Sequence, residues 1–176
     1  MKKELIIGCG YKITEKAVKV DGDSKYGNPT TLDINPDVKS DYLWDLNNIP
    51  LPFKDNEFDE IHAYEILEHL GSQGDYEFFF NQFTDFWRIL KPNGIFCATV
   101  PNWDDIGALG EPSHKRVINE LTLLHLSQEQ YKSNVGKTPR SDFRYLYKAD
   151  FKLIFLEKTR YRLAFVLEAI KESDYE

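Results

Sequence analysis

The chain has 176 residues, with 22 Lys+Arg against 29 Asp+Glu and a formal net charge of −7. Hydrophobic residues make up 41% of it and aromatic residues 14%, which excludes a chain without a packed core. Its apolar runs are all shorter than the roughly 18–20 residues that a membrane-spanning helix needs. The acidic balance also argues against a protein that coats nucleic acid, because phosphate backbones select basic surfaces.

The length and the absence of linkers or repeats predict one domain over residues 1–176. Two cysteines, Cys9 and Cys97, are too few for a disulfide framework, so a cytoplasmic location is expected. Lys2 and Lys3 precede a short apolar stretch before Cys9, as in a lipoprotein leader. That stretch is shorter than the roughly 7–15 residues of a signal peptide, which favours a buried strand.

The first half of the chain predicts strands that alternate with turns. Apolar runs predict strands over residues 5–7, 30–34, 41–46 and 58–64. The segment 11–28 leaves little room for a helix, and two prolines exclude regular structure over 49–53.

The second half begins with the clearest helical pattern of the chain. Aromatic and aliphatic residues recur on one helical face over 75–90, with Ser72 or Asp75 as the cap, and the sequence Lys-Pro-Asn-Gly at 91–94 ends the helix. On this pattern the Phe78-Phe79-Phe80 run belongs to the core. A strand over 95–100 follows, ended by Pro101 and a long loop over 102–116.

The remaining elements complete an α/β pattern. Asn119 is expected to cap a short helix up to 126, and Ser127 and Gln130 have capping-box spacing. Two further strands are predicted over 151–156 and 161–170. The series predicts an α/β, Rossmann-like, mostly parallel sheet of the seven-stranded type. It has an antiparallel C-terminal strand pair and is abbreviated after the first strand. In such sheets ligands bind at the carboxyl ends of the strands.

Two features at these strand ends indicate a bound nucleoside. The Gly8-Cys9-Gly10 turn lets the backbone approach a ligand closely, although it would also serve as a simple strand-ending turn. Asp33 follows at about the interval at which nucleotide folds place a ribose-binding carboxylate, and it would alternatively close a turn before Asn35-Pro36. Ile13 occupies the third glycine position of the dinucleotide fingerprint, which disfavours NAD or FAD.

An ordered series of motifs from about Leu5 to Pro101 resembles the class I S-adenosylmethionine (SAM)-dependent methyltransferases, specifically the small methyltransferase-domain, type 11-like group. The matching segments are Ile6-Ile7-Gly8-Cys9-Gly10, Leu32-Asp33-Ile34-Asn35-Pro36, Trp44-Asp45-Leu46-Asn47, Leu51-Pro52-Phe53, Phe58-Asp59-Glu60-Ile61, Leu67-Glu68-His69-Leu70 and Trp87-Arg88-Ile89-Leu90-Lys91-Pro92-Asn93-Gly94. The segment 111–116 and the last strand pair match more loosely.

The resemblance implies SAM as cofactor and methyl transfer as reaction. It implies that Gly8, Cys9 and Gly10 wrap the methionine part, that Asp33 with Ile34 holds the ribose, and that Asp45 and Leu46 contact the adenine. Residues 65–69, beginning with Glu65, would line the methyl-transfer face. Lys12 stands where the family's third glycine is usual; it would meet the cofactor carboxylate or remain a solvated charge.

Methyl transfer needs a nucleophile held in line with the sulfonium, and a base helps where the acceptor is a hydroxyl or amine. His69 and His114 are the candidate bases, with Glu65 beside them; a structural hydrogen bond is the alternative role for His69. Glu68 would share this site or favour a helix N-terminus. His62 is expected to pack inside a strand. The four histidines and two cysteines lack metal-ligand spacing, so no metal is expected.

The acceptor itself is predicted only in outline. From His114 to Arg162 there are 11 basic and 5 acidic residues, a local charge of +6, which leaves −13 for the rest. A small, sugar-like, neutral or anionic acceptor is therefore expected, with Lys115 and Arg116 near it. Residues 64–67 read Tyr-Glu-Ile-Leu instead of the motif of DNA-amino methyltransferases, so nucleic acid is not expected. A SAM-binding regulatory subunit and an NAD(P)-dependent oxidoreductase remain alternatives, and the oligomeric state stays open between monomer and homodimer.

Overall fold

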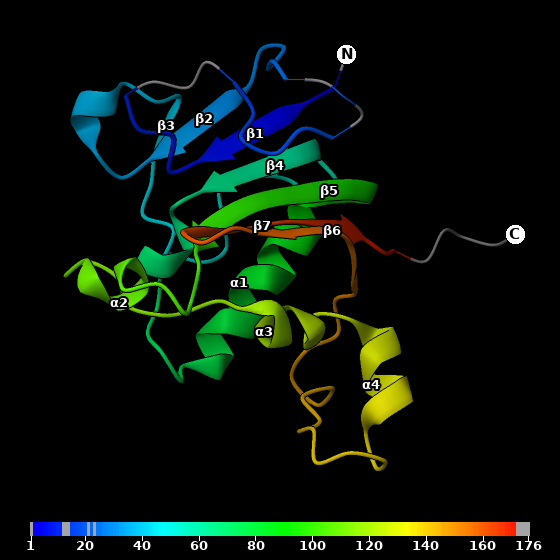
Figure 1. Cartoon of the computed structure of the whole chain (residues 1–176). Helices are drawn as coiled ribbons and strands as arrows, with labels where there is room; N and C mark the ends of the chain where they lie inside the picture. The colour runs from blue at the N-terminus through cyan, green and yellow to red at the C-terminus, as the bar shows by residue number, and fades with distance from the viewer. Residues whose placement is uncertain (1, 12–14, 21, 23, 172–176) are drawn as a thin grey trace, which may run out of the picture.

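A seven-stranded sheet forms the centre of the protein in a computed structural model that describes residues 2–11, 15–20, 22 and 24–171 (Figure 1). The strands lie in the order β3-β2-β1-β4-β5-β7-β6. Their bounds are β1 Glu4–Ile7, β2 Thr30–Asp33, β3 Tyr42–Leu43, β4 Phe58–Tyr64, β5 Leu90–Pro101, β6 Phe151–Lys158 and β7 Arg162–Ala169. β1 and β4 are buried almost throughout, as expected of central strands.

β7 runs in the direction opposite to the other six strands. The pairs from β3 to β5 are parallel, whereas β7 is antiparallel to both β5 and β6. The carboxyl ends of β1, β2 and β4 therefore meet at one edge of the sheet, where the turns that follow them gather. This topology confirms the predicted fold class.

The helices lie mainly on one face of the sheet (Figure 1). The longest, α1 Tyr76–Ile89, begins where the Asp75 side chain accepts a hydrogen bond from the Phe78 amide, as predicted. Three short helices follow β5, and Asn119 and Ser127 cap the last two of them as expected. These helices are α2 Gly107–Gly110, α3 Glu120–Leu124 and α4 Gln128–Asn134.

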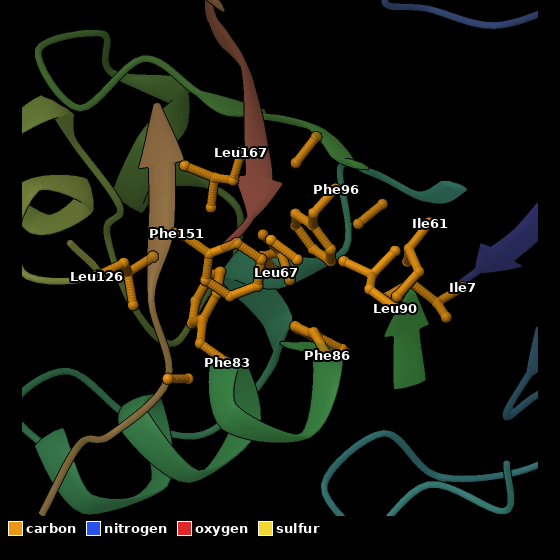
Figure 2. Close-up of a cluster of buried hydrophobic side chains, with 14 of the residues drawn as sticks. Ile7, Ile61, Leu67, Phe83, Phe86, Leu90, Phe96, Leu126, Phe151 and Leu167 are labelled. Atoms are coloured by element: carbon orange, nitrogen blue, oxygen red, sulfur yellow. The ribbon is translucent and has the colours of Figure 1, made fainter. Parts of the chain in front are cut away.

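The aromatic face of α1 forms the main core against the sheet (Figure 2). The Phe86 ring stacks on Phe96 of β5 with ring centroids 4.8 Å apart, and Phe83 meets Phe96 and Phe151 edge-on. Phe80 is also buried, which confirms that the Phe78-Phe79-Phe80 run belongs to the core. Aromatic burial of this kind dominates the stability of a core.

The opposite face is covered by an irregular segment between β1 and β2, whose described residues, 8–11, 15–20, 22 and 24–29, form no helix. Lys16 anchors this segment beneath the sheet. Its Nζ lies 2.6 Å from a carboxylate oxygen of Glu4 and 2.7 Å from one of Glu60, and all three side chains are at least 97% buried. His62 Nε2 lies 3.1 Å from the same Glu60 oxygen. Val18 then packs on Cys97, Ala164 and Val166.

Three sequence expectations need correction. The third strand is limited to Tyr42–Leu43, because both residues are exposed at the sheet edge and chain pairing ends there. The helix does end just before residues 91–94, but the strand after it begins at Leu90 and not at residue 95. Leu90 pairs with Phe58 of β4, residues 91–94 form an irregularity in the ladder, and pairing resumes at Ile95 with Glu60. The loop after β5 contains α2, which no pattern indicated because its four residues carry no amphipathic period.

Among the described residues, no helix is both long and apolar enough to cross a membrane.

Replacing Lys16 by Met tests the buried ion cluster. The change leaves the Glu4 and Glu60 carboxylates buried together without their cation, so we expect a loss of about 3–5 kcal/mol in the free energy of unfolding. Chemical denaturation measures it, and the exposed neighbour Lys19→Met should stay within about 0.5 kcal/mol of the native protein.

This loss should also depend on pH. Burial alone would raise the pKa of Glu60, but hydrogen bonds from His62, Lys16 and Lys2 outweigh it and hold the pKa well below the ordinary 4.5. A depressed carboxyl pKa stabilises the fold above the unfolded-state value and loses this effect as pH falls. The Lys16→Met deficit should therefore be full above about pH 4.5 and shrink below it. A deficit that is constant over that range would contradict this account.

Candidate functional site

The Gly8-Cys9-Gly10 turn at the end of β1 depends on its first glycine. Gly8 has a φ of +64°, and a Cβ built there would lie 2.5 Å from Cγ1 of Ile66. The amides of Gly8 and Cys9 both donate to the Leu32 carbonyl, at 2.9 and 3.3 Å. β1 and β2 are thereby tied together just where a ligand would lie against the turn.

Asp33, at the end of β2, is tied to the same turn. Its Oδ2 accepts the Gly10 amide at 2.9 Å and its Oδ1 accepts the Asn35 amide at 2.8 Å. Each carboxylate oxygen has two lone pairs, so one acceptor position remains on each. A vicinal diol, such as that of a ribose, offers two donors that match these positions. Asp33 is 8% exposed, which orders it and leaves it reachable.

Asp45 is held beside the same pocket by Asn47. Asp45 Oδ1 accepts both the backbone amide and the side-chain amide of Asn47, each at 2.8 Å. Asn47 Oδ1 in turn accepts the Gly71 amide at 2.9 Å, which fixes this segment to the chain after β4. Asp45 Oδ2 has no donor among the described residues, so it is available to an exocyclic amine.

These residues line one pocket of about 190 Å³. Ile34 forms an apolar wall that is 62% exposed, of the kind that an aromatic ring can cover. The complete lining is Gly8, Asp33, Ile34, Trp44, Asp45, Leu46, Asn47, Ile66, His69, Leu70 and Lys115.

A second group of polar side chains adjoins the pocket at the 3₁₀ turn η2 (Leu67–His69) after β4. His69 Nε2 and His114 Nε2 each lie 4.0 Å from Oε1 of Glu68, and the two imidazole rings are 4.8 Å apart. The segment carrying His114 is held there because the Lys115 amide donates to the Glu68 carbonyl at 2.8 Å. The fold thus brings together the two predicted histidines.

Glu68 is the residue that sequence reasoning undervalued. It is 2% exposed, and neither carboxylate oxygen has a hydrogen-bond partner. Burial, with the negative charge of Glu65 adding to it, raises the pKa of Glu68 to about 8. A perturbed carboxyl group in a cleft is a common mark of a functional site. The Glu-His dipeptide after a strand was the only sequence signal for it.

Arg116 has a structural role in place of the predicted acceptor contact. It is 4% exposed, and its guanidinium donates to the Leu67 carbonyl and the Gln82 side chain. Burial lowers its pKa to about 10. Lys115, by contrast, is exposed at the pocket. Part of the +6 segment is also elsewhere, because α4 lies far from the carboxyl ends of the strands (Figure 1).

The other predicted site residues divide between the pocket and its surroundings. Leu46 lines the pocket, and Cys9 is buried beneath it with a pKa raised to about 11 by burial and by Asp33. Glu65 is exposed at the end of β4, with a φ of +50°, and does not line the pocket. Lys12 and Ile13 lie outside the described residues. His62 is fully buried in β4, as expected.

Solved structures that match this fold include SAM-dependent methyltransferases and a [4+2]-cyclase. A SAM-dependent methyltransferase from Archaeoglobus fulgidus matches with a TM-score of 0.58 and 16% identity, over 95% of this chain and 86% of that one. The [4+2]-cyclase SpnF matches with a TM-score of 0.56 and 13% identity, over 96% and 75%. A SAM-dependent methyltransferase from Mesorhizobium loti gives 0.54 and 13%, over 95% and 90%.

No protein-family model and no curated protein matches the chain significantly. The structural matches, at 12–18% identity, show that the chain has the Rossmann-like fold of the class I methyltransferases. The fold resemblance drawn from the motif series is thereby confirmed.

Gly8→Ala tests the turn that shapes the pocket. The left-handed backbone costs about 1–2 kcal/mol with a Cβ, and the overlap with Ile66 adds about 1–3 kcal/mol. Gly10→Ala is the matched control, because Gly10 has a φ of +60° but open space around a Cβ. Denaturant unfolding should show the larger loss for Gly8→Ala. In a double-mutant cycle, Ile66→Ala should cost less in the Gly8→Ala background than alone; equal costs would contradict the predicted clash.

Proposed function

We propose that the protein binds SAM at the carboxyl edge of the sheet and transfers its methyl group to a small acceptor. The observation that carries the proposal is the single pocket that joins the Gly8 turn, the two spare acceptor positions of Asp33 and the unpaired oxygen of Asp45. Together they match a nucleoside: a diol for Asp33, an amine for Asp45 and a ring face for Ile34.

Methyl transfer depends more on how the acceptor is positioned relative to the SAM methyl group than on acid–base assistance. The sulfonium is already a good leaving group, so the acceptor atom must lie about 3–3.5 Å from the methyl carbon, in line with the sulfur. His69 forms part of the pocket wall, with His114 and Glu68 behind it and Glu65 at the exposed end of β4. We assign the acceptor to this side, where an imidazole can accept a proton from a hydroxyl or amine.

The two alternatives predict different ligands and different turnover. A dinucleotide places its pyrophosphate at the N-terminus of the helix after the first strand, and the described residues of that segment form no helix. This favours SAM over NAD(P). A regulatory subunit would bind SAM without turnover, and the SpnF match shows that the fold also serves other reactions.

Asp33→Asn tests cofactor binding. The amide keeps the shape of the carboxylate but loses its charge and one acceptor oxygen, so the dissociation constant for SAM should rise about 10–100-fold. Isothermal titration calorimetry with SAM and with its demethylated product, S-adenosylhomocysteine, measures the change. Asp37→Asn, an exposed aspartate four residues away, is the matched control. Equal affinities in the native protein and both variants would overturn the assignment.

Lys115→Glu tests the character of the acceptor, which we propose to be small, sugar-like and neutral or anionic. Release of S-adenosylhomocysteine is followed over a panel of hydroxylated carboxylic acids, sugar phosphates and neutral sugars. Reversing this exposed charge should raise KM for anionic acceptors and leave neutral ones unchanged. Lys137→Glu, in the same basic segment but outside the pocket lining, should change neither. SAM binding without turnover of any acceptor would favour the regulatory alternative.

A further inference from the structure

Three side chains that could bind a metal ion lie together beside the proposed cofactor pocket. The side chains of Glu68, His69 and His114 each offer one ligand atom, and these three atoms lie within 4.8 Å of one another. All three come to one place because η2 carries the first two and the backbone pairing of Lys115 with Glu68 brings in the third. Spacing along the sequence did not reveal the group.

The hydrogen bonds of the two imidazoles determine which nitrogen faces Glu68. His69 Nδ1 is 3.2 Å from the Ser113 carbonyl and His114 Nδ1 is 3.0 Å from the Ala108 carbonyl. A carbonyl only accepts, so each Nδ1 carries a proton and, in a neutral ring, each Nε2 carries a lone pair. Both lone pairs then face a carboxylate whose oxygens have no donor. With Glu68 ionised, three acceptors converge on one point, and none of the other described residues donates to it.

The protein contains an internal comparison for this arrangement. A second group of carboxylate and imidazole side chains lies under the opposite face of the sheet. It consists of Glu4, Glu60 and His62, whose ligand atoms also lie within 4.8 Å of one another. There the Lys16 ammonium occupies the centre, 2.6–2.7 Å from both carboxylates. At Glu68 the nearby cation is Arg116, but its guanidinium donates to the Leu67 carbonyl and the Gln82 side chain instead.

We propose that Glu68, His69 and His114 bind a divalent transition-metal ion through Glu68 Oε1 and the two Nε2 atoms. Two imidazoles and one carboxylate suit Zn²⁺, Mn²⁺ or Co²⁺, and the Nδ1–H···O=C bonds are the outer contacts that orient metal-binding histidines. Ligands at about 2.0–2.2 Å in tetrahedral geometry are about 3.4 Å apart. The 4.0 Å separations between each Nε2 and Glu68 Oε1 would therefore close by about 0.6 Å on binding.

The ion would lie on the acceptor side of the pocket, since His69 belongs to the pocket lining and is 32% exposed. Three protein ligands leave coordination positions open. A hydroxyl or carboxylate oxygen of an acceptor can fill one, which would orient the acceptor and favour deprotonation of a hydroxyl. With both Nε2 atoms bound to the ion, this effect would replace the imidazole base of the metal-free site. Coordination of the acceptor by the ion rests on the proposed function, and it implies that the acceptor is an oxygen nucleophile. Metal binding itself does not depend on it.

The test is metal binding by the full chain after dialysis against a chelator. Titration with Zn²⁺ and Mn²⁺ by calorimetry, and with Co²⁺ by its visible ligand-field absorption, should show one ion per chain. Glu68→Gln keeps the size of the side chain but removes its charge. Its loss of affinity should exceed the roughly 10–100-fold that removal of an outer contact costs. His114→Ala should behave alike, and Glu111→Gln, an exposed glutamate of the same segment, should bind as the native protein does.

Thermal unfolding and circular dichroism establish whether each variant is folded. If His114→Ala does not fold, Glu68→Gln still tests the site. No binding by the native protein, or equal binding by Glu68→Gln, would overturn the metal site. S-adenosylhomocysteine affinity is measured on the same samples. Metal binding without cofactor binding would overturn the proposed function alone, and cofactor binding without metal binding would overturn this inference alone.

Discussion

The ion cluster around Lys16 is the constraint on which the first half of the structure depends. The segment between β1 and β2 covers one face of the sheet, and its described residues contain no helix that would pack there by an apolar stripe. A buried ammonium between Glu4 of β1 and Glu60 of β4 holds it instead. Such a cluster contributes little net stability but penalises every arrangement that separates its members. It therefore fixes the position of Lys16 and of the described residues around it against the sheet.

The same principle connects the two faces of the molecule. Under one face of the sheet, the Lys16 ammonium lies between the carboxylates of Glu4 and Glu60, beside His62. At the carboxyl edge, none of the described residues places a cation in the same way between Glu68, His69 and His114. Buried acceptors without donors are costly, and a bound ion is one of the ways in which such groups are satisfied. This difference is the basis of the proposed metal site, although the residue types of the two groups are nearly the same. The proposed site adjoins His69, which lines the pocket.

Local patterns were sufficient for the sheet and the long helix but not for the second part of the site. β4 and α1 follow from alternation, helical period and the Asp75 cap, and Asp33 follows from its interval after the glycine turn. Glu68 and His114 are 46 residues apart and meet only because a backbone pairing closes the loop after β5. Arg116 was misjudged for the same reason: Lys115 before it is exposed, but the Arg116 guanidinium is buried against Leu67 and Gln82. Polar side chains that meet only through the tertiary fold form no regular spacing in the sequence, so a search for periodic patterns does not find them.

We propose that one pocket, built from the ends of β1, β2 and β3, receives the nucleoside of SAM. A crystal structure of the protein grown with S-adenosylhomocysteine is the decisive test. We expect density against the Gly8 turn, with the ribose hydroxyls on Asp33 and the adenine amine at Asp45. Density at another position, such as the apolar cavity of about 170 Å³ beside Phe79 and Phe143, would contradict it, as would crystals without ligand at saturating concentration.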